Sequence, residues 1–452
     1  MRIQFLGGAG TVTGSKYLIT SERAAILLDC GLFQGYKQLR LRNWARLPVD
    51  PARLDAVVLT HAHLDHSGYL PLLVKDGFKG KIICSEATRD LCKILLPDSG
   101  HLQEEDAAAA NRHGYSRHSP ALPLYTEEDA RVALRQFVTV PFGEHVAVAP
   151  GLHARFSRAG HILGAAIVTL DDGSRSITFS GDLGRSNDPI MTPPAPREAS
   201  DYLVVESTYG NRIHDPSDPL VELGRIIRDT AARGGVVVIP AFAVGRAQGL
   251  MYFMHQLKAS GAIPAFLPVF LDSPMARDAT AIYHRHREDH RLSAQECQAM
   301  CHAATIVNTV DESKQLDARN TPKVIISASG MATGGRVLHH IKAFADDPRN
   351  TILFAGFQAG GTRGAALVEG ADAVRIHGQQ VRVRAQVAYI GNLSAHADSN
   401  ELLAWMSNQA KPPRRTFVTH GEPAASEALR LKIKHELGWE CLVPEHLQEV
   451  RL

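Results

Sequence analysis

The sequence predicts an α/β protein in which a sandwich of mixed β-sheets is interrupted by a second domain of parallel α/β type. Between residues 2 and 206, short apolar strands alternate with glycine-rich or polar turns. After Thr208 the strands become nearly continuous apolar runs, each followed by a helix, which is typical of a parallel sheet buried on both faces. The first pattern returns near the carboxyl end. We therefore expect a discontinuous first domain, residues 1–207 and 396–452, around an inserted domain, residues 208–395.

The elements of the first domain follow from alternating apolar residues and from helical spacing. Its expected strands cover residues 3–6, 17–19, 25–29, 56–60, 81–84, 153–158, 166–170, 176–180, 202–206 and 416–419. Its expected helices cover residues 68–76, 126–138 and 401–408, with a closing helix after residue 420. Residues 111–123 are polar and contain two prolines, so we expect a loop there.

The inserted domain repeats a strand–helix order. Its expected strands cover residues 236–240, 269–272, 323–327 and 351–355, and its expected helices cover residues 247–257, 276–286 and 336–344.

Composition indicates an ordinary globular protein: 44% of residues are hydrophobic, 21% are charged, and the formal net charge is +2. The amino end is unlike a secretory signal, and no apolar run is long enough for a membrane helix. Six cysteines are too few for a disulfide framework in 452 residues. We expect a cytoplasmic protein with reduced thiols, without a membrane span and without an appended carboxyl-terminal RNA-binding module.

The most informative motif is His61-Ala-His63-Leu-Asp65-His66, which follows an expected strand directly. Four ligand-type side chains within six residues of a strand end can point into one cavity, and imidazole with carboxylate is a typical ligand set for zinc. This turn cannot complete two sites alone, so further ligands should follow other strands, next to glycine. The candidates are His161, Asp182 and His420.

These residues resemble the metallo-β-lactamase superfamily, and the whole chain resembles its β-CASP branch of nucleic-acid nucleases. The resemblance includes the opening Phe5-Leu-Gly-Gly and the segment Leu27-Leu-Asp29-Cys-Gly31. It continues with Glu206 in Glu-Ser-Thr-Tyr-Gly, His396 in Ser-Ala-His-Ala-Asp and His420 in Thr-His-Gly. The implied fold is an αββα sandwich with an inserted β-CASP domain. The chain is most similar to bacterial relatives of the pre-mRNA 3′-end cleavage endonuclease.

The resemblance implies two Zn²⁺ per chain. One ion would take His61, His63 and His161; the other would take Asp65, His66 and His420; Asp182 would bridge them. Asp29 would orient a ligand imidazole, or cap a turn, and the two roles are compatible.

The reaction implied by the resemblance is hydrolysis of single-stranded RNA, which leaves 5′-phosphate and 3′-hydroxyl ends. Asp65 and Asp182 would be catalytic through the metal ions. His396 would stabilise or protonate the leaving oxygen, and Glu206 would hold its imidazole. The alternative for this pair is an ordinary polar contact.

Two glycine-rich loops of the inserted domain offer backbone N–H groups to substrate phosphates. The expected phosphate-binding residues are Ser329, Gly330, Thr333, Gly334, Gly335, Arg336 and Arg363. Arg185 and Arg246 are comparable candidates. Such loops are often merely tight turns. A homodimer is also compatible with the resemblance.

A second group of candidate ligands lies in the inserted domain. Cys297 and Cys301 lie four apart on an expected helix with His302 beside them, and we expect two half-buried thiols rather than a third metal site. The run from His284 to His290 is rich in both charge signs, and we interpret it as a solvated face.

Three other functions compete with RNA cleavage. A DNA nuclease of the same branch usually carries a smaller apolar residue where this chain has His420. Hydrolysis of a small thioester or lactam does not explain the inserted domain. A non-catalytic RNA-processing scaffold would have lost ligands, whereas every ligand position is filled here.

Overall fold

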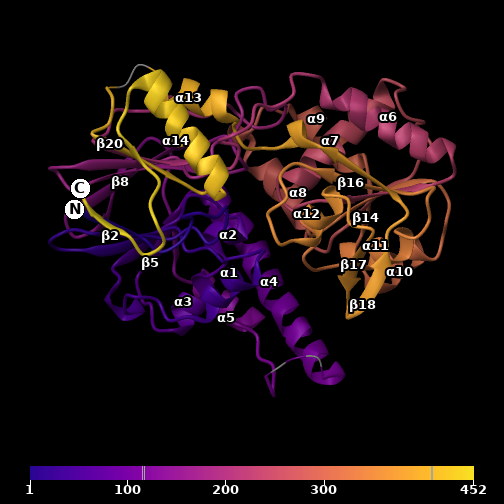
Figure 1. Ribbon diagram of the computed structural model, residues 1–452, viewed down its shortest axis with the longest axis horizontal. Coiled ribbons are helices and arrows are strands. Elements are labelled where there is room, and N and C mark those ends of the chain that lie inside the picture. Colours follow the sequence, from indigo (N-terminus) through magenta and orange to yellow (C-terminus); the bar gives the residue numbers. More distant parts are fainter. Residues whose placement is uncertain (115, 117, 409–410) are drawn as a thin grey trace. The chain divides into compact units, whose positions relative to one another are not determined.

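The computed structural model describes residues 1–114, 116, 118–408 and 411–452, and these form two compact units. Unit 1 comprises Met1–Ile213 and His396–Leu452, and unit 2 comprises His214–Ala395 (Figure 1). Each unit has its own sheets and its own core.

Unit 1 contains two mixed sheets. In the described part of the chain each has seven strands. The first has the order β22 (Glu449–Arg451), β1 (Arg2–Phe5), β2 (Tyr17–Thr20), β3 (Ala25–Leu28), β4 (Ala56–Val58), β5 (Lys81–Cys84), β6 (Phe137–Thr139). The second has the order β21 (Cys441–Leu442), β20 (Arg415–Thr419), β11 (Tyr202–Glu206), β10 (Ser176–Phe179), β9 (Ala166–Asp171), β8 (Leu152–Arg158), β7 (His145–Ala149).

Strand direction changes within each sheet. Strands β1 to β3 pair antiparallel and β3 to β6 pair parallel. In the second sheet β7 to β10 pair antiparallel, whereas β10, β11, β20 and β21 run parallel. The sheets are therefore mixed, and the α/β class expected from the sequence is confirmed.

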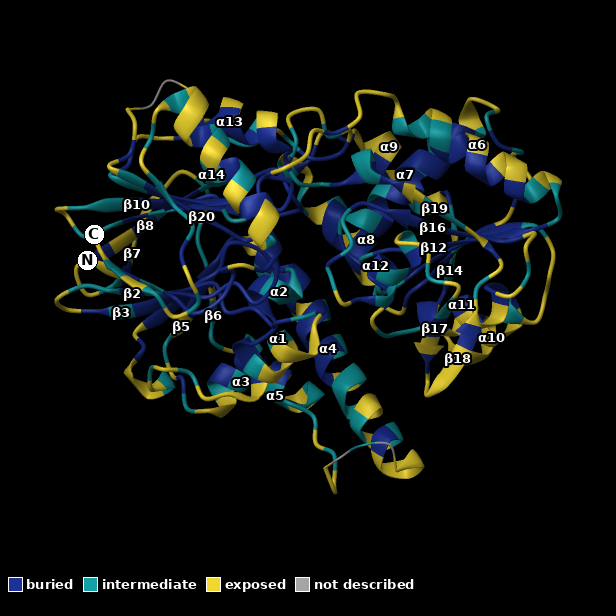
Figure 2. Cartoon of the chain, viewed as in Figure 1, coloured by how far each residue is buried: buried dark blue, intermediate teal, exposed yellow. Residues whose placement is uncertain are grey.

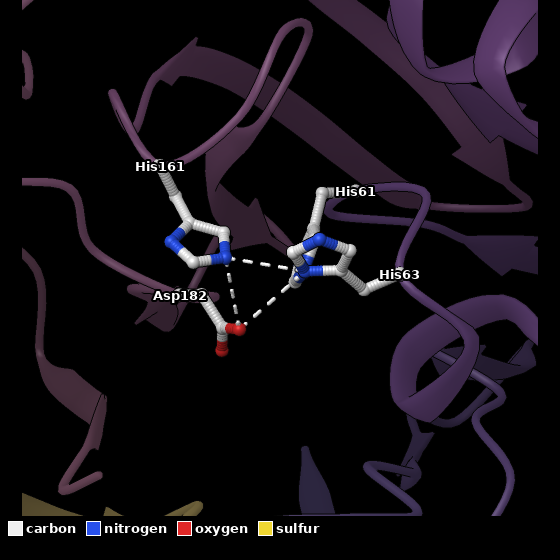
Figure 3. A group of neighbouring side chains, drawn as sticks. All are labelled: His61, His63, His161 and Asp182. Carbon is white, nitrogen blue, oxygen red and sulfur yellow. Dashed lines mark hydrogen bonds and ion pairs between the residues drawn. The ribbon is translucent and has the colours of Figure 1, made fainter. Parts of the chain in front are cut away.

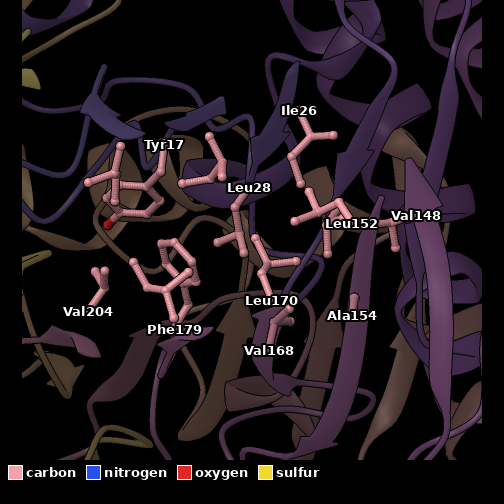
Figure 4. Close-up of a cluster of buried hydrophobic side chains, with 14 of the residues drawn as sticks. Tyr17, Ile26, Leu28, Val148, Leu152, Ala154, Val168, Leu170, Phe179 and Val204 are labelled. Atoms are coloured by element: carbon pink, nitrogen blue, oxygen red, sulfur yellow. The ribbon is translucent and has the colours of Figure 1, made fainter. Parts of the chain in front are cut away.

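Apolar side chains from both sheets form one core between them. Ile26 and Leu28 on β3 and Leu170 and Phe179 on the second sheet belong to the same buried cluster (Figure 4). Leu27 points to the opposite face of β3 and is also buried. The first sheet is therefore covered on both faces at this strand.

Helices cover the outer faces of unit 1, and they agree only in part with the sequence expectations. In the described residues they are α1 (Lys37–Leu41), α2 (Leu64–Ser67), α3 (Leu70–Lys75), α4 (Glu86–His113), α5 (Glu127–Leu134), α13 (Ser399–Ser407) and α14 (Pro423–Leu437). Helix α4 was not expected; it begins at a Ser85 cap, passes through Pro97 and packs on α5. The loop expected from residue 111 begins later, after His113, and its residues 115 and 117 lie outside the described residues.

Unit 2 is built around a sheet with the order β14 (Thr305–Val307), β13 (Val269–Asp272), β15 (Lys323–Ser327), β12 (Val236–Pro240), β16 (Thr351–Ala355), β19 (Gln386–Ile390). All of these pairings are parallel. The central strands β12, β15 and β16 are buried along their whole length (Figure 2). This is the burial expected of a parallel sheet with helices on both faces.

The remaining elements of unit 2 surround this sheet. They are α6 (Pro219–Ala232), α7 (Arg246–Ala259), α8 (Ala276–Arg285), α9 (Ala294–His302), α10 (Val310–Asp317), α11 (Val337–Phe344), α12 (Arg363–Val368) and the hairpin β17 (Ala373–Ile376) with β18 (Gln379–Arg382). Among the described residues, no helix of either unit combines the length and apolar character that a bilayer span requires.

A buried charge network joins β13 to α10 and α11. His340 Nε2 lies 2.8 Å from Asp272 Oδ2, and His340 Nδ1 lies 2.6 Å from Asp317 Oδ1. Carboxylate oxygens only accept hydrogen bonds, so both ring nitrogens must donate and the imidazole is cationic. Arg336 Nη1 donates to Asp272 Oδ1 at 2.7 Å. Burial acts to lower the pKa of His340, but the two carboxylates outweigh it and raise the pKa.

This network predicts a pH dependence of stability. A pKa raised above its unfolded value contributes stability that is complete below about pH 6.5 and is lost as the pH rises through the folded pKa. We expect the melting temperature to fall over that range, and a His340→Gln chain to lose this part of the slope. Calorimetry of both chains across this range measures the difference. Equal slopes would contradict a cationic His340.

Candidate metal centre

The turn that carries His61, His63, Asp65 and His66 is held by the segment after β3. The N–H groups of Cys30 and Leu32 donate to the carbonyl oxygens of His66 and Leu64, which fixes α2 beside the end of β3. The approach is so close that a Cβ on Gly31 would lie 1.6 Å from the Asp65 carbonyl oxygen. Only glycine fits at position 31.

The other candidate ligands follow strands of the second sheet. Because β10, β11 and β20 run parallel, the residues that end or follow them meet at one edge: Asp182, Glu206 and His420. His161 follows β8, which has the same direction as β10 because two antiparallel pairings separate them. The topology therefore gathers residues from distant parts of the sequence.

His61, His63, His161 and Asp182 form one group of donor atoms (Figure 3). Both His61 Nε2 and His161 Nε2 lie 3.2 Å from His63 Nδ1. Asp182 Oδ2 lies 3.3 Å from His61 Nε2 and 3.5 Å from His161 Nε2. Four donors in a tetrahedron around zinc, at about 2.0–2.1 Å from it, would be about 3.3 Å apart. The group fits a zinc ion.

Asp65, His66, His420 and Asp182 form a second group. His66 Nε2 lies 3.1 Å from His420 Nε2 and 3.2 Å from Asp182 Oδ1. Asp65 Oδ2 lies 3.3 Å from His420 Nε2 and 3.8 Å from His66 Nε2. These separations fit the same kind of ion.

Asp182 belongs to both groups and turns one carboxylate oxygen toward each. Its side chain is buried, and Oδ1 accepts no well-aligned hydrogen bond from the described residues. Burial acts to raise its pKa, but the imidazoles of His420 and His66 hold the pKa well below its usual range. A buried, ionised carboxylate with an unsatisfied oxygen is suited to bridge two cations.

Burial keeps the three imidazoles of the first group neutral. It lowers the pKa of His61 and His161, and it lowers the pKa of His63 to about 3. A neutral imidazole presents a lone pair, which is the form that binds a metal ion.

Asp29 both orients a candidate ligand and caps a turn. Its Oδ2 accepts from His66 Nδ1 at 2.7 Å, so His66 Nε2 is the nitrogen turned to the second group. Its Oδ1 accepts from the Thr60 N–H at 2.7 Å. Asp29 has a φ of 57°, a left-handed conformation that its short polar side chain tolerates.

Glu206 and His396 lie beside the first group. Glu206 is buried, and its Oε2 lies 3.0 Å from His396 Nδ1. The His396 side chain is 16% exposed, and its ring centroid lies 4.4 Å from that of His161. Burial acts to lower the pKa of His396, but the Glu206 carboxylate outweighs it and raises the pKa.

Two threonines that the sequence did not single out connect these residues. The Thr208 hydroxyl donates to Glu206 Oε2 at 2.6 Å and lies 3.1 Å from His420 Nδ1. The Thr60 hydroxyl donates to Asp29 Oδ2 and lies 3.1 Å from His61 Nδ1. Thr60 directly precedes His61 and Thr208 lies two residues after Glu206, so their positions beside motif residues could have identified them in the sequence.

The predicted phosphate-binding residues all lie in unit 2, whereas the two donor groups lie in unit 1. The Ser329 hydroxyl accepts from the Thr333 N–H and tightens the first loop. A Cβ on Gly330 would meet Phe242, Gly335 has a φ of 73°, and Gly334 has open space around it.

The two arginines of these loops already have protein partners. Arg336 donates to Asp272 and to the Asn308 carbonyl oxygen, and Arg363 donates to the Arg375 and Thr333 carbonyl oxygens. Of the two comparable candidates, Arg185 lies near Glu401 in unit 1 and Arg246 begins α7 in unit 2. Phosphate binding by these residues stays a prediction.

The sandwich fold and the cluster of imidazoles and carboxylates define a metallo-hydrolase. Three family models match the chain: the metallo-β-lactamase superfamily over residues 9–221, the β-CASP domain over 247–367, and the Zn-dependent metallo-hydrolase RNA specificity domain over 380–444. The chain belongs to the β-CASP family of the metallo-β-lactamase superfamily.

Relatives of similar length include Ribonuclease TTHA0252 of Thermus thermophilus, 36% identical over 93% of both chains. Transcription termination factor FttA of Methanosarcina mazei is 32% identical over all of this chain and 72% of its own length. A crystal structure of a protein of unknown function from Enterococcus faecalis V583 aligns over all of this chain and 99% of its own, with a TM-score of 0.51 and 12% identity. That last likeness concerns the fold alone.

Proposed function

We propose that the chain is a zinc-dependent ribonuclease that hydrolyses phosphodiester bonds of single-stranded RNA and leaves 5′-phosphate and 3′-hydroxyl ends. The observation that carries the proposal is the buried Asp182 carboxylate, whose two oxygens face two groups of zinc-type donors. The name of the Thermus relative and the RNA specificity domain support RNA as the substrate.

In this proposal each chain binds two zinc ions. His61, His63 and His161 would hold one ion, Asp65, His66 and His420 would hold the other, and Asp182 would contribute a carboxylate oxygen to each. When bound, zinc supplies Lewis-acid activation of water near neutral pH. Asp29 keeps the His66 ring in the orientation that turns Nε2 toward the second donor group.

The chain itself supplies the proton for the leaving 3′ oxygen. Glu206 Oε2 accepts from His396 Nδ1, which leaves Nε2 as the ring nitrogen that hands its proton to the departing oxygen. Glu206 is held in turn by the Leu183 N–H and the Thr208 hydroxyl, so the carboxylate has little freedom to turn away. In this role His396 acts on the reacting atoms, and Glu206 positions it.

Several finer assignments belong to the same proposal. The inserted domain covers residues 208–395, and its glycine-rich loops bind substrate phosphates through backbone N–H groups, since Arg336 and Arg363 already have protein partners. The six cysteines form no disulfide in the described structure, which supports a cytoplasmic location. A homodimer stays a prediction from the sequence.

Removing the bridging carboxylate tests the metal assignment and the activity together. We expect Asp182→Ala and His420→Ala chains to retain less zinc and to lose RNA cleavage, because each removes a donor that no neighbour can replace. His435→Ala is the matched control, since His435 is exposed on α14 and belongs to neither donor group. Metal analysis and cleavage of end-labelled RNA measure both effects.

The choice of substrates separates the modes of action. Labelled RNA with a 5′-phosphate, RNA with a 5′-triphosphate, a closed RNA circle and matched DNA would be compared with the native chain. Cleavage of the circle indicates an endonuclease, and dependence on the 5′ group indicates an exonuclease. If the protein binds two zinc ions and cleaves DNA but leaves RNA intact, the proposal is contradicted.

The proton donor can be tested apart from the metal. We expect His396→Ala to keep its zinc and to cleave about 10²–10⁴-fold more slowly, the usual loss when a general acid is removed. Glu206→Gln should lower turnover in the same direction with little change in KM, because it alters the donor and not the binding of RNA. Unchanged turnover in both variants, with normal zinc content, would refute this role.

A further inference from the structure

A second cluster of ligand-type side chains lies in unit 2, where α8 packs on α9 (Figure 1). His284 is in the last turn of α8. Cys297 and Cys301 lie four residues apart on α9, which places both thiols on one face of the helix. The His284 nitrogen and the two sulfur atoms all lie within 4.8 Å of one another.

The structure corrects the expectation for this region. His302 does not join the thiols: it is exposed, and its Nδ1 lies 2.8 Å from the Gln298 carbonyl oxygen. The run from His284 to His290 is not simply a solvated face, because His290 is buried with Nε2 3.0 Å from the Tyr283 carbonyl oxygen. His284, at the other end of that run, faces the cysteines.

The separation of His284 and Cys301 fits a tetrahedral metal ion. Zinc binds imidazole nitrogen at about 2.0–2.1 Å and thiolate sulfur at about 2.3 Å, so a nitrogen and a sulfur on one ion lie about 3.6 Å apart. His284 Nε2 and Cys301 Sγ are 3.6 Å apart. One imidazole nitrogen with two thiolate sulfurs is a donor set found in zinc sites, whereas Mg²⁺ and Ca²⁺ are hard cations that prefer oxygen ligands.

The burial of the three residues is graded. Cys297 is 1% exposed, whereas His284 and Cys301 are half-buried. Cys297 is therefore held in the packed interior, whereas His284 and Cys301 are partly accessible to solvent and so to an entering ion. The cluster shares no residue with the two donor groups of unit 1.

We propose that His284, Cys297 and Cys301 bind a third zinc ion that fastens α8 to α9, with the fourth coordination position open to solvent. The ion is distinct from the ions of the proposed nuclease site in its ligands and in its unit. Binding replaces the thiol protons, which are released to solvent as the two Zn–S bonds form.

Cobalt(II) provides a spectroscopic probe of this site in the full chain. Both donor groups of unit 1 contain only nitrogen and oxygen, so absorption from thiolate-to-cobalt charge transfer can arise only from cysteine ligands. We expect metal-free native protein titrated with Co²⁺ to develop this near-ultraviolet band, and its final intensity to correspond to two thiolates on one ion per chain, because the Co²⁺ taken up by unit 1 does not contribute to the band. The band should persist in Asp182→Ala, which separates this inference from the nuclease proposal.

The variants make the test specific. Cys301→Ser and His284→Gln should lose the band or shift its saturation to much higher Co²⁺, whereas Cys441→Ser, a half-buried cysteine of unit 1, should keep it. Circular dichroism of the metal-free variants confirms that they are folded. Absence of the band in the native chain, its survival in Cys301→Ser, or its loss in Cys441→Ser would overturn the proposal.

Discussion

The buried, ionised carboxylate of Asp182 is the constraint on which the arrangement of the neighbouring imidazoles and carboxylates depends. A buried charge is costly unless it is paired, and the three imidazoles of the first group carry no net charge of their own, because burial lowers the pKa of His61, His63 and His161. Cations between these donors satisfy the carboxylate and the lone pairs together. The donor separations of about 3.2–3.5 Å around Asp182 Oδ2 match that solution.

The fold meets this constraint with strand direction and glycine. Parallel strands β10, β11 and β20 end at one edge, so side chains more than two hundred residues apart in sequence converge. Gly31 lets the backbone after β3 touch the turn that carries Asp65, and Asp29 fixes the ring of His66 from the same segment. The supporting residues thus come from both sheets of unit 1, and the site depends on the sandwich being closed.

The candidate metal ligands of unit 1 could be predicted from the sequence, because they follow strands directly and four of them lie in the closely spaced motif from His61 to His66. Helix α4 was missed because Pro97 and Gly100 interrupt its pattern, yet tertiary packing on α5 sustains it. The partners of Arg336 were hidden as well, since Asp272 lies 64 residues away and only the β13–β15 pairing brings it near. The proximity of His284 and Cys301 was likewise not predictable from their spacing in the sequence, because the packing of α8 on α9 brings them together.

The central claim is that Asp182 bridges two zinc ions. Anomalous diffraction at the zinc absorption edge, on crystals grown with zinc, tests it most directly. We predict two peaks about 3.5–4 Å apart, one beside Asp182 Oδ2 with His61, His63 and His161, and one beside Oδ1 with the second group. A single peak at this cluster, or two peaks of which only one contacts Asp182, would contradict the claim.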